Sequence, residues 1–359
     1  MTDLQAPFPY FGGKSRISAD VWAALGQPKH YIEPFFGSGA VLLARPDYDP
    51  TTHMETICDK DGYVANAWRA MQHDPDEVAK WCDWPVNHAD LSARKRKLLA
   101  NRETLLAGLI EDDDWCDPKL AGYWIWAASC WIGSGLTSLG QRPHVSHGGT
   151  GVHKLGQIPH VGHGGKGVHK IGKRPHVSDG GKGVHRLGQR PHVSDGRKGV
   201  REPYNANLYT WFRELSERLR YVRVVCGDWS RVCGGNWQDK MGVCGMFFDP
   251  PYGVKDRDEV YDTDSYTVAA KVTAWARERG RMKRYRIVLA GYEEHAELEA
   301  DGWRVKQWSA RGGYANSKRN EDSEAVGMAN RHRERLYFSP HCLTADGLSL
   351  FDAEKGGAR

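Results

Sequence analysis

One short run in the second half of the sequence carries residue types that could activate an aromatic amine. Residues 247–252 read FFDPPY, so Asp249, Pro250, Pro251 and Tyr252 directly follow an apolar stretch. The Asp249 carboxylate and the Pro250 carbonyl oxygen can accept hydrogen bonds, and the Tyr252 ring offers a stacking surface. An aromatic amine attacks a methyl donor only when acceptors hold its hydrogens, because its lone pair is otherwise delocalised into the ring. The run predicts amine methylation, although a strand end followed by a Pro-Pro turn would also account for it.

The element that must position Asp249 is a short buried strand. Residues 241–248, MGVCGMFF, form an apolar run, and the prolines that follow cannot extend a sheet ladder. Open α/β sheets bind their ligands outside the carboxyl ends of the strands. We therefore predict an α/β fold with Asp249 at the carboxyl edge of its sheet. Further strands are expected at residues 221–225, 286–290, 303–308 and 335–338, and helices at 18–25, across 60–120 and at 209–220.

A second strand, with a glycine turn after it, could hold a nucleoside cofactor. Residues 31–43, YIEPFFGSGAVLL, read as a strand, a turn containing Gly37 and Gly39, and the start of an apolar helix. Asp59 follows 20 residues after Gly39, at the end of the strand-like residues 55–58. An acid at about this distance accepts hydrogen bonds from ribose hydroxyls in nucleotide-binding α/β units. Because the dinucleotide fingerprint G-x-G-x-x-G is absent, the pattern together with Asp249 favours S-adenosylmethionine over a dinucleotide.

A third candidate lies near the amino terminus, where residues 10–14 read YFGGK. Paired glycines let a backbone pass close to a ligand, and Lys14 can offer a positive charge to a carboxylate. Taken separately, this motif and the Gly-x-Gly turn each fit an ordinary turn. Their order along the chain is therefore the stronger signal.

Together, residues 10–14, residues 33–39, Asp59 and residues 249–252 resemble the motifs of the Dam-type, alpha-group adenine-N6 DNA methyltransferases, in the same order. The resemblance implies a class I S-adenosylmethionine-dependent methyltransferase fold. This fold is Rossmann-like, with a mixed, largely parallel sheet, helices on both faces and an inserted target-recognition region. The resemblance also implies that adenine is flipped out of the duplex before methylation at N6. The cytosine-N4 DNA methyltransferases use similar chemistry, and a catalytically inactive DNA-binding protein of the same fold is a further alternative.

The resemblance also implies roles for individual residues. The catalytic residues it implies are Asp249, Pro250, Pro251 and Tyr252. The cofactor-binding residues it implies are Tyr10, Lys14, Glu33, Phe35, Gly37, Gly39, Asp59, Asp228 and Asp249. Asp228 corresponds less closely than the others, to the family's acid near the cofactor adenine. Tyr10 replaces a frequent tryptophan, and the region between the motifs differs from the enterobacterial enzymes, so the resemblance does not imply a recognition sequence.

Residues 139–202 contain four consecutive 16-residue repeats, each with a Pro-His-Val segment and a His-Gly or Asp-Gly turn signal. Each unit predicts a short strand, a tight turn and a second short strand. Twelve Lys or Arg against three Asp or Glu give the repeats a net charge of +9, whereas the whole chain carries +5. Such a charge favours binding to the phosphates of double-stranded DNA over the role of a mobile spacer. The DNA-binding residues that we predict are Arg142, Lys154, Lys170, Arg174, Arg186 and Arg190.

Nine of the sixteen histidines also lie in the repeats, which raises the alternative of a metal site. Their regular spacing follows from the duplication, and His147 and His163 are replaced by Asp179 and Asp195 in later units. We therefore predict no metal ligands here and expect turn or phosphate contacts from these histidines.

Composition and motif order predict the domain organisation. We expect a catalytic domain in residues 1–70 and 205–345, a target-recognition insertion in 71–204 and a tail in 346–359. Eight cysteines with no Cys-x-x-Cys pair, and no secretory leader, favour the cytoplasm of a bacterial or phage-infected cell. Residues 121–139 are uncharged over 19 residues, but their glycines and aromatic residues favour a buried helix over a membrane span. No nuclease-like motif is evident, which favours a solitary modification enzyme.

Overall fold

The computed structural model describes residues 4–10, 14–112, 114–131, 136, 204–235, 237–240, 242–251, 266–308 and 333–344. The predicted repeats at 139–202 and the predicted tail at 346–359 lie outside the described residues. The division into a catalytic domain and an insertion stays a prediction.

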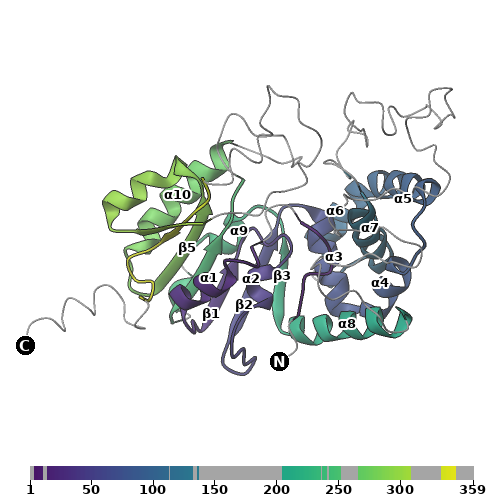
Figure 1. The fold of residues 1–359 in the computed structure, drawn as a ribbon, viewed down its shortest axis with the longest axis horizontal. Helices are drawn as coiled ribbons and strands as arrows, with labels where there is room; N and C mark the ends of the chain where they lie inside the picture. Colours follow the sequence, from purple (N-terminus) through teal and green to yellow (C-terminus); the bar gives the residue numbers. More distant parts are fainter. Residues whose placement is uncertain are drawn as a thin grey trace, which may run out of the picture.

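The described residues form an α/β structure around one seven-stranded sheet (Figure 1). The strands are β1 (His30–Glu33), β2 (Met54–Asp59), β3 (Val222–Cys226), β4 (Cys244–Phe248), β5 (Tyr285–Gly291), β6 (Arg304–Gln307) and β7 (Arg335–Phe338). Their order across the sheet is β3-β2-β1-β4-β5-β7-β6. All pairs are parallel except those of β7, which runs antiparallel to both β5 and β6. The sheet is therefore mostly parallel, as the sequence predicts.

The chain changes direction across the sheet between β1 and β4. From β1 it builds outward through β2 to β3, and it then returns to place β4 on the other side of β1. A reversal of this kind leaves a crevice at the carboxyl ends of the two central strands, where doubly wound sheets bind ligands. Every residue of β1 and of β4 is buried, as expected for central parallel strands that are covered on both faces.

Helices cover both faces of the sheet. The helices are α1 (Ser18–Leu25), α2 (Ala40–Leu43), α3 (Gly62–His73), α4 (Pro75–Cys82), α5 (His88–Ala100), α6 (Arg102–Glu111), α7 (Pro118–Cys130), α8 (Tyr204–Leu219), α9 (Ser230–Cys233) and α10 (Tyr266–Gly280), with 3-10 helices η1 (Trp237–Lys240) and η2 (Glu293–Asp301). Figure 1 shows α3 to α8 gathered beyond β3 at one end of the molecule and α10 beside β5 at the other.

Two hydrophobic clusters form the core, one on each face of the sheet. Phe247 belongs to the cluster that contains α1 and α3, whereas its neighbour Phe248 belongs to the cluster that contains α9 and α10. Successive strand residues point to opposite faces, so this alternation follows from the strand itself. Phe247 and Phe248 thus fix β4 from both sides just before Asp249.

Most of the predicted elements agree with the structure. The helix at 18–25 and the strand at 335–338 have the predicted bounds, and residues 60–120 are helical from α3 into α7. The uncharged stretch begins inside α7, which is buried and starts at Pro118 because the Asp117 carboxylate accepts a hydrogen bond from the Leu120 amide at 2.8 Å. No helix in the described part of the chain is long and apolar enough to cross a membrane. The sequence pattern does not predict α10, and the apolar helix expected after Gly39 is only the four-residue α2.

Candidate active site

The acids that the sequence singles out lie at one edge of the sheet. Glu33 is the last residue of β1, Asp59 is the last residue of β2, and Asp249 directly follows β4. Asp228 follows β3 by two residues. Because β3, β2, β1 and β4 are parallel neighbours, their carboxyl ends share this edge. These four acids, which span residues 33 to 249 of the sequence, are therefore brought to one edge of the sheet.

The Gly-x-Gly turn is shaped so that only glycine fits. Gly37 and Gly39 have φ values of +50° and +67°, which side chains disfavour. A Cβ atom on Gly37 would lie 2.6 Å from the ring of Tyr10, and one on Gly39 would lie 2.5 Å from the ring of Phe36. The structure thus brings the amino-terminal motif against the turn, through Tyr10. The tight packing explains both glycines without reference to a ligand.

Asp59 ties this turn to β2. Its Oδ2 atom accepts a hydrogen bond from the Gly37 amide at 2.8 Å, and its Oδ1 atom accepts one from the Asp61 amide at 2.9 Å. Burial, and then the charge of Asp61, raise the pKa of Asp59 to about 7, although hydrogen bonds from backbone amides oppose the shift. Each carboxylate oxygen has a second lone pair, so Asp59 can hold the turn and still accept a ligand hydroxyl.

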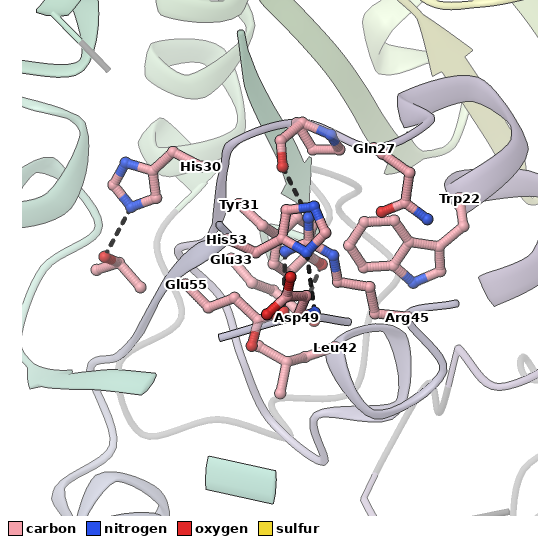
Figure 2. Close-up of polar contacts among 12 residues, drawn as sticks. Trp22, Gln27, His30, Tyr31, Glu33, Leu42, Arg45, Asp49, His53 and Glu55 are labelled. Atoms are coloured by element: carbon pink, nitrogen blue, oxygen red, sulfur yellow. Dashed lines mark hydrogen bonds and ion pairs between the residues drawn. The ribbon is translucent and has the colours of Figure 1, made fainter. Parts of the chain in front are cut away.

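Glu33 lies deeper than the other acids. The Tyr31 hydroxyl donates a hydrogen bond to Glu33 Oε2 at 2.8 Å, and the Glu33 residue is only 2% exposed (Figure 2). Burial raises the pKa of Glu33 well above its usual range, and the negative charge of Asp249 raises it further. The charge of Asp249 thus acts on Glu33, and the two acids lie at the ends of the neighbouring strands β4 and β1.

Lys14 and Asp249 form a direct ion pair. Lys14 Nζ lies 2.8 Å from Asp249 Oδ2, with the side chains 7% and 21% exposed. Lys14 Nζ also lies 5.9 Å from the centre of the Trp308 ring, within the range of a cation–π contact. The structure thus joins the first and last predicted motifs, and it adds Trp308, which is not among the site residues that the sequence predicts. The signal that could have found Trp308 is its place after β6, which runs parallel to β4 and ends at the same edge.

Aromatic rings pack against one another at the ends of β1, β3 and β4. Phe35 lies 6.4 Å from Phe248 between ring centres, and Phe248 lies 6.3 Å from Trp229. Phe35 packs against the core cluster on the α10 face, next to Phe248. Among the predicted catalytic prolines, Pro250 is buried and Pro251 is half-buried. These contacts hold the chain after β4 in place without using the Asp249 carboxylate.

Asp228 has a local structural role. Its Oδ1 atom accepts hydrogen bonds from the Ser230 amide at 3.0 Å and from the Ser230 hydroxyl at 2.6 Å, at the start of α9. This arrangement accounts for an acid at position 228 by itself, although Asp228 lies at the same sheet edge as Asp59. A role for Asp228 in cofactor binding stays a prediction.

Several predicted residues lie outside the described part of the chain. They are the stacking residue Tyr252 and the DNA-binding residues Arg142, Lys154, Lys170, Arg174, Arg186 and Arg190. Their roles stay predictions. Within the described residues, no group of three or more His, Cys, Asp or Glu side chains is arranged to hold a metal ion.

The candidate site offers a defined set of chemical groups. Among the described residues, acceptors are present at Asp59, at Asp249 and in the backbone after β4, and a cation is present at Lys14. Comparison with models of known protein families gave no match, and comparison with curated protein sequences gave none either.

Proposed function

We propose that the chain is a DNA methyltransferase that transfers a methyl group from S-adenosylmethionine to N6 of adenine. The observation that carries the proposal is the position of Asp249. It follows the central strand β4, beside the glycine turn that follows β1, and it is paired with Lys14 at 2.8 Å. The mixed, largely parallel sheet with helices on both faces agrees with the class I methyltransferase fold that the sequence resemblance implies.

The residues at the sheet edge fit the parts of this cofactor. The Asp59 carboxylate would accept hydrogen bonds from the ribose hydroxyls, and the turn at Gly37 and Gly39 would lie along the methionine part. Lys14 would pair with the carboxylate of the amino acid. Tyr10 supports the turn, since a Cβ on Gly37 would lie 2.6 Å from its ring. This fit supports a nucleoside with an attached amino acid over a nucleotide, because the described part of this edge carries acids and only a single buried cation close to Asp249.

The chemistry would then depend on two acceptors. When bound, S-adenosylmethionine would supply a methyl group on a sulfonium sulfur, whose bond to carbon breaks as the new bond to nitrogen forms. The Asp249 carboxylate and the Pro250 carbonyl oxygen would accept the two hydrogens of the amine, which directs its lone pair toward the methyl carbon. Asp249 would also take the proton that the amine loses. Orientation and fixed charges supply the acceleration in such a site.

The target would be double-stranded DNA. A duplex hides the adenine amine, so the base must be flipped out at a cost of a few kcal/mol. Contacts with backbone phosphates can offset that cost, and the net charge of +9 in residues 139–202 supports such contacts. Flipping would deliver the amine to the Asp249 edge.

Transfer of labelled methyl groups into duplex DNA tests the proposal. Wild-type protein should label DNA, and Asp249→Asn should reduce the rate by about 100-fold or more, because an amide oxygen is a weaker acceptor than a carboxylate and cannot take up the proton. Asp76→Asn is the matched control, since Asp76 is an exposed acid on α4 that pairs with Arg213. Circular dichroism establishes that both variants are folded. Equal labelling by wild type and Asp249→Asn would contradict the proposal.

A further inference from the structure

The pairing of Lys14 with Asp249 poses a problem for the proposed chemistry. An ammonium at 2.8 Å occupies one oxygen of the carboxylate that must accept a hydrogen from the amine. The same Lys14 is the cation at this edge that is suited to the carboxylate of a bound amino acid. Lys14 therefore has two competing anionic partners, one belonging to the protein and one belonging to the ligand.

The surroundings of Lys14 fit a side chain that changes partner. Its backbone is anchored, because the Lys14 carbonyl accepts a hydrogen bond from the Ile17 amide at 3.1 Å just before α1. The ammonium stands at the end of a four-carbon stem, so it can move while the backbone stays fixed. The Trp308 ring, 5.9 Å from Nζ, favours a cation at this place whichever anion accompanies it.

Lys14 could leave Asp249 without leaving either charge unpaired. Removing one partner from a buried ion pair is costly when the other charge is left alone. The Asp249 side chain is only 21% exposed, so losing Lys14 with no cation in its place would be unfavourable. A sulfonium cofactor brings its own positive charge to Asp249 and its own carboxylate to Lys14. Both protein charges would therefore keep a partner.

We infer that Lys14 exchanges partners, pairing with Asp249 when the cofactor is absent and with the cofactor carboxylate when it is present. The inference rests on the proposed function and adds an order of events to it. The Asp249 oxygen that Lys14 occupies becomes available to the target amine only after the cofactor has bound. When the sulfonium has become a neutral thioether, Lys14 can return to Asp249, which favours release of the product.

Binding of two ligands that differ only in the carboxylate tests the exchange. The ligands are S-adenosylhomocysteine and its decarboxylated analogue, which keeps the amine and the neutral sulfur. The measured quantity is the ratio of their dissociation constants by calorimetry, which reports how much the carboxylate contributes. In wild type, Asp249 competes for Lys14. Asp249→Asn should therefore raise the ratio about fivefold or more, as expected for coupled equilibria.

A double-mutant cycle separates competition from simple repulsion. Lys14→Met should abolish the carboxylate preference, and adding Asp249→Asn to Lys14→Met should leave the ratio unchanged. Direct repulsion between Asp249 and the ligand carboxylate would instead raise the ratio equally in both backgrounds, which would overturn the exchange. An unchanged ratio in Asp249→Asn would overturn it as well. Arg16→Met, which removes an exposed cation from the same loop, should behave as wild type.

These outcomes are distinct from failure of the proposed function. If wild-type protein bound neither ligand, cofactor binding itself would be wrong, and the exchange would fall with it. If wild-type protein bound both ligands and the cycle showed no competition, the cofactor site would stand and Lys14 would be a fixed contact. The readout is binding, so it does not depend on identifying a DNA sequence.

Discussion

Single atoms decide the shape of the turn between β1 and α2. The Gly37 amide is fixed by the Asp59 carboxylate at 2.8 Å, the Gly37 carbonyl accepts a hydrogen bond from Trp68 Nε1 at 2.8 Å, and the Gly37 Cα faces the Tyr10 ring. A residue held on three sides cannot shift to accept a side chain. The turn is thus rigid before any ligand binds, and such preorganisation reduces the cost of binding.

Alanine at Gly37 should therefore destabilise the protein more than alanine at another left-handed glycine. Gly235 has φ of +72°, but a Cβ there would meet no atom of the described residues within 4 Å, so Gly235→Ala should cost only about 1 kcal/mol of unfolding free energy. Gly37→Ala adds a collision with Tyr10 and should cost about 2–4 kcal/mol. Urea unfolding measures both values. Equal costs would contradict the tight packing of Tyr10 on the turn.

The pH dependence of stability should reveal Asp59. Its pKa of about 7 in the folded chain lies above its ordinary value of 3.8, so between these values the folded state binds more protons than the unfolded state. Unfolding free energy contributed by Asp59 therefore falls as pH rises from about 4 to 7 and then levels off. Wild type should lose on the order of 2 kcal/mol relative to Asp59→Asn between pH 5 and pH 7.

Comparison with Asp59→Asn is needed because other buried groups titrate in the same range. Burial lowers the pKa of His30 and of His295 from 6.5 to about 4. Their contribution to the unfolding free energy therefore decreases as pH falls from about 6.5 to 4. They act alike in the two proteins and cancel in the difference. If the difference in unfolding free energy between wild type and Asp59→Asn stayed constant from pH 5 to pH 8, burial would not raise the pKa of Asp59.

Among the elements, α8 is joined to the sheet by a buried group of charges. Glu55 of β2 pairs with Arg45 at 3.1 Å and with Arg218 of α8 at 2.7 Å, and the Glu55 and Arg45 side chains are fully buried. Figure 2 shows Arg45 and Glu55 close to Tyr31 and Glu33. Arg218 also donates a hydrogen bond to the Leu42 carbonyl at 3.0 Å. The helix that follows the predicted insertion is thereby fixed to the strands that carry the site.

Two arginines of α8 should differ sharply in their contribution to stability. Arg218→Met leaves Glu55 with a single partner in the core and should cost about 3 kcal/mol. Arg213→Met breaks the exposed pair with Asp76, whose side chains are 61% and 48% exposed, and should cost at most about 1 kcal/mol. Urea unfolding of both variants tests this, and similar costs would show that the buried pair does not anchor α8.

Some helices and strands could be predicted from the sequence, whereas others could not. The strand β4 was predictable because an apolar run ends at prolines, and α1 because its apolar residues follow a helical period. The helix α10 follows the predicted catalytic run and has a weaker pattern, with alanines at two of its buried positions, Ala269 and Ala276. In the site, the acids after the strands were predictable from local spacing. The contacts of Tyr10 with Gly37, of Lys14 with Asp249 and of Trp308 with Lys14 join distant segments, so no local pattern encodes them.

The basic run at residues 94–97 illustrates the same limit. Four consecutive cations suggest a solvated surface, yet Arg94 and Lys95 are buried while Arg96 and Lys97 are exposed. Arg94 lies 4.3 Å from the Tyr123 ring centre and 4.4 Å from that of Trp126, which α7 supplies. Arginine can pack in this way because its guanidinium stacks on aromatic faces. Two of these four charges therefore belong to the core around α7.

Across the whole molecule, charge is distributed unevenly along the chain. The repeats carry a net +9, so the rest of the chain is negative against a total of +5. Phosphate contacts made by the repeats would release counterions, which makes affinity fall with salt. The proposed catalytic residues and the proposed phosphate-binding charges would then lie in different segments of the chain, and each could be altered separately.

Neutralising the repeats should flatten the salt dependence of DNA binding. The full-length variant replaces Arg142, Lys154, Lys170, Arg174, Arg186 and Arg190 by glutamine. At about 0.9 per lost phosphate contact, the slope of log affinity against log salt should decrease by up to about 5. Glutamine at Lys29 and Lys283, two exposed residues at the opposite edge of the sheet, should leave the slope unchanged. An unchanged slope in the repeat variant would assign DNA binding to another part of the chain.

Nucleoside analysis of treated DNA tests the central claim most directly. Duplex DNA is incubated with the protein and S-adenosylmethionine carrying a heavy methyl group, digested to nucleosides and examined by mass spectrometry. We predict heavy N6-methyladenine with wild-type protein and its loss with Asp249→Asn. Heavy N4-methylcytosine would contradict the choice of base, and the absence of any heavy methylated nucleoside would contradict methyl transfer to DNA by this site.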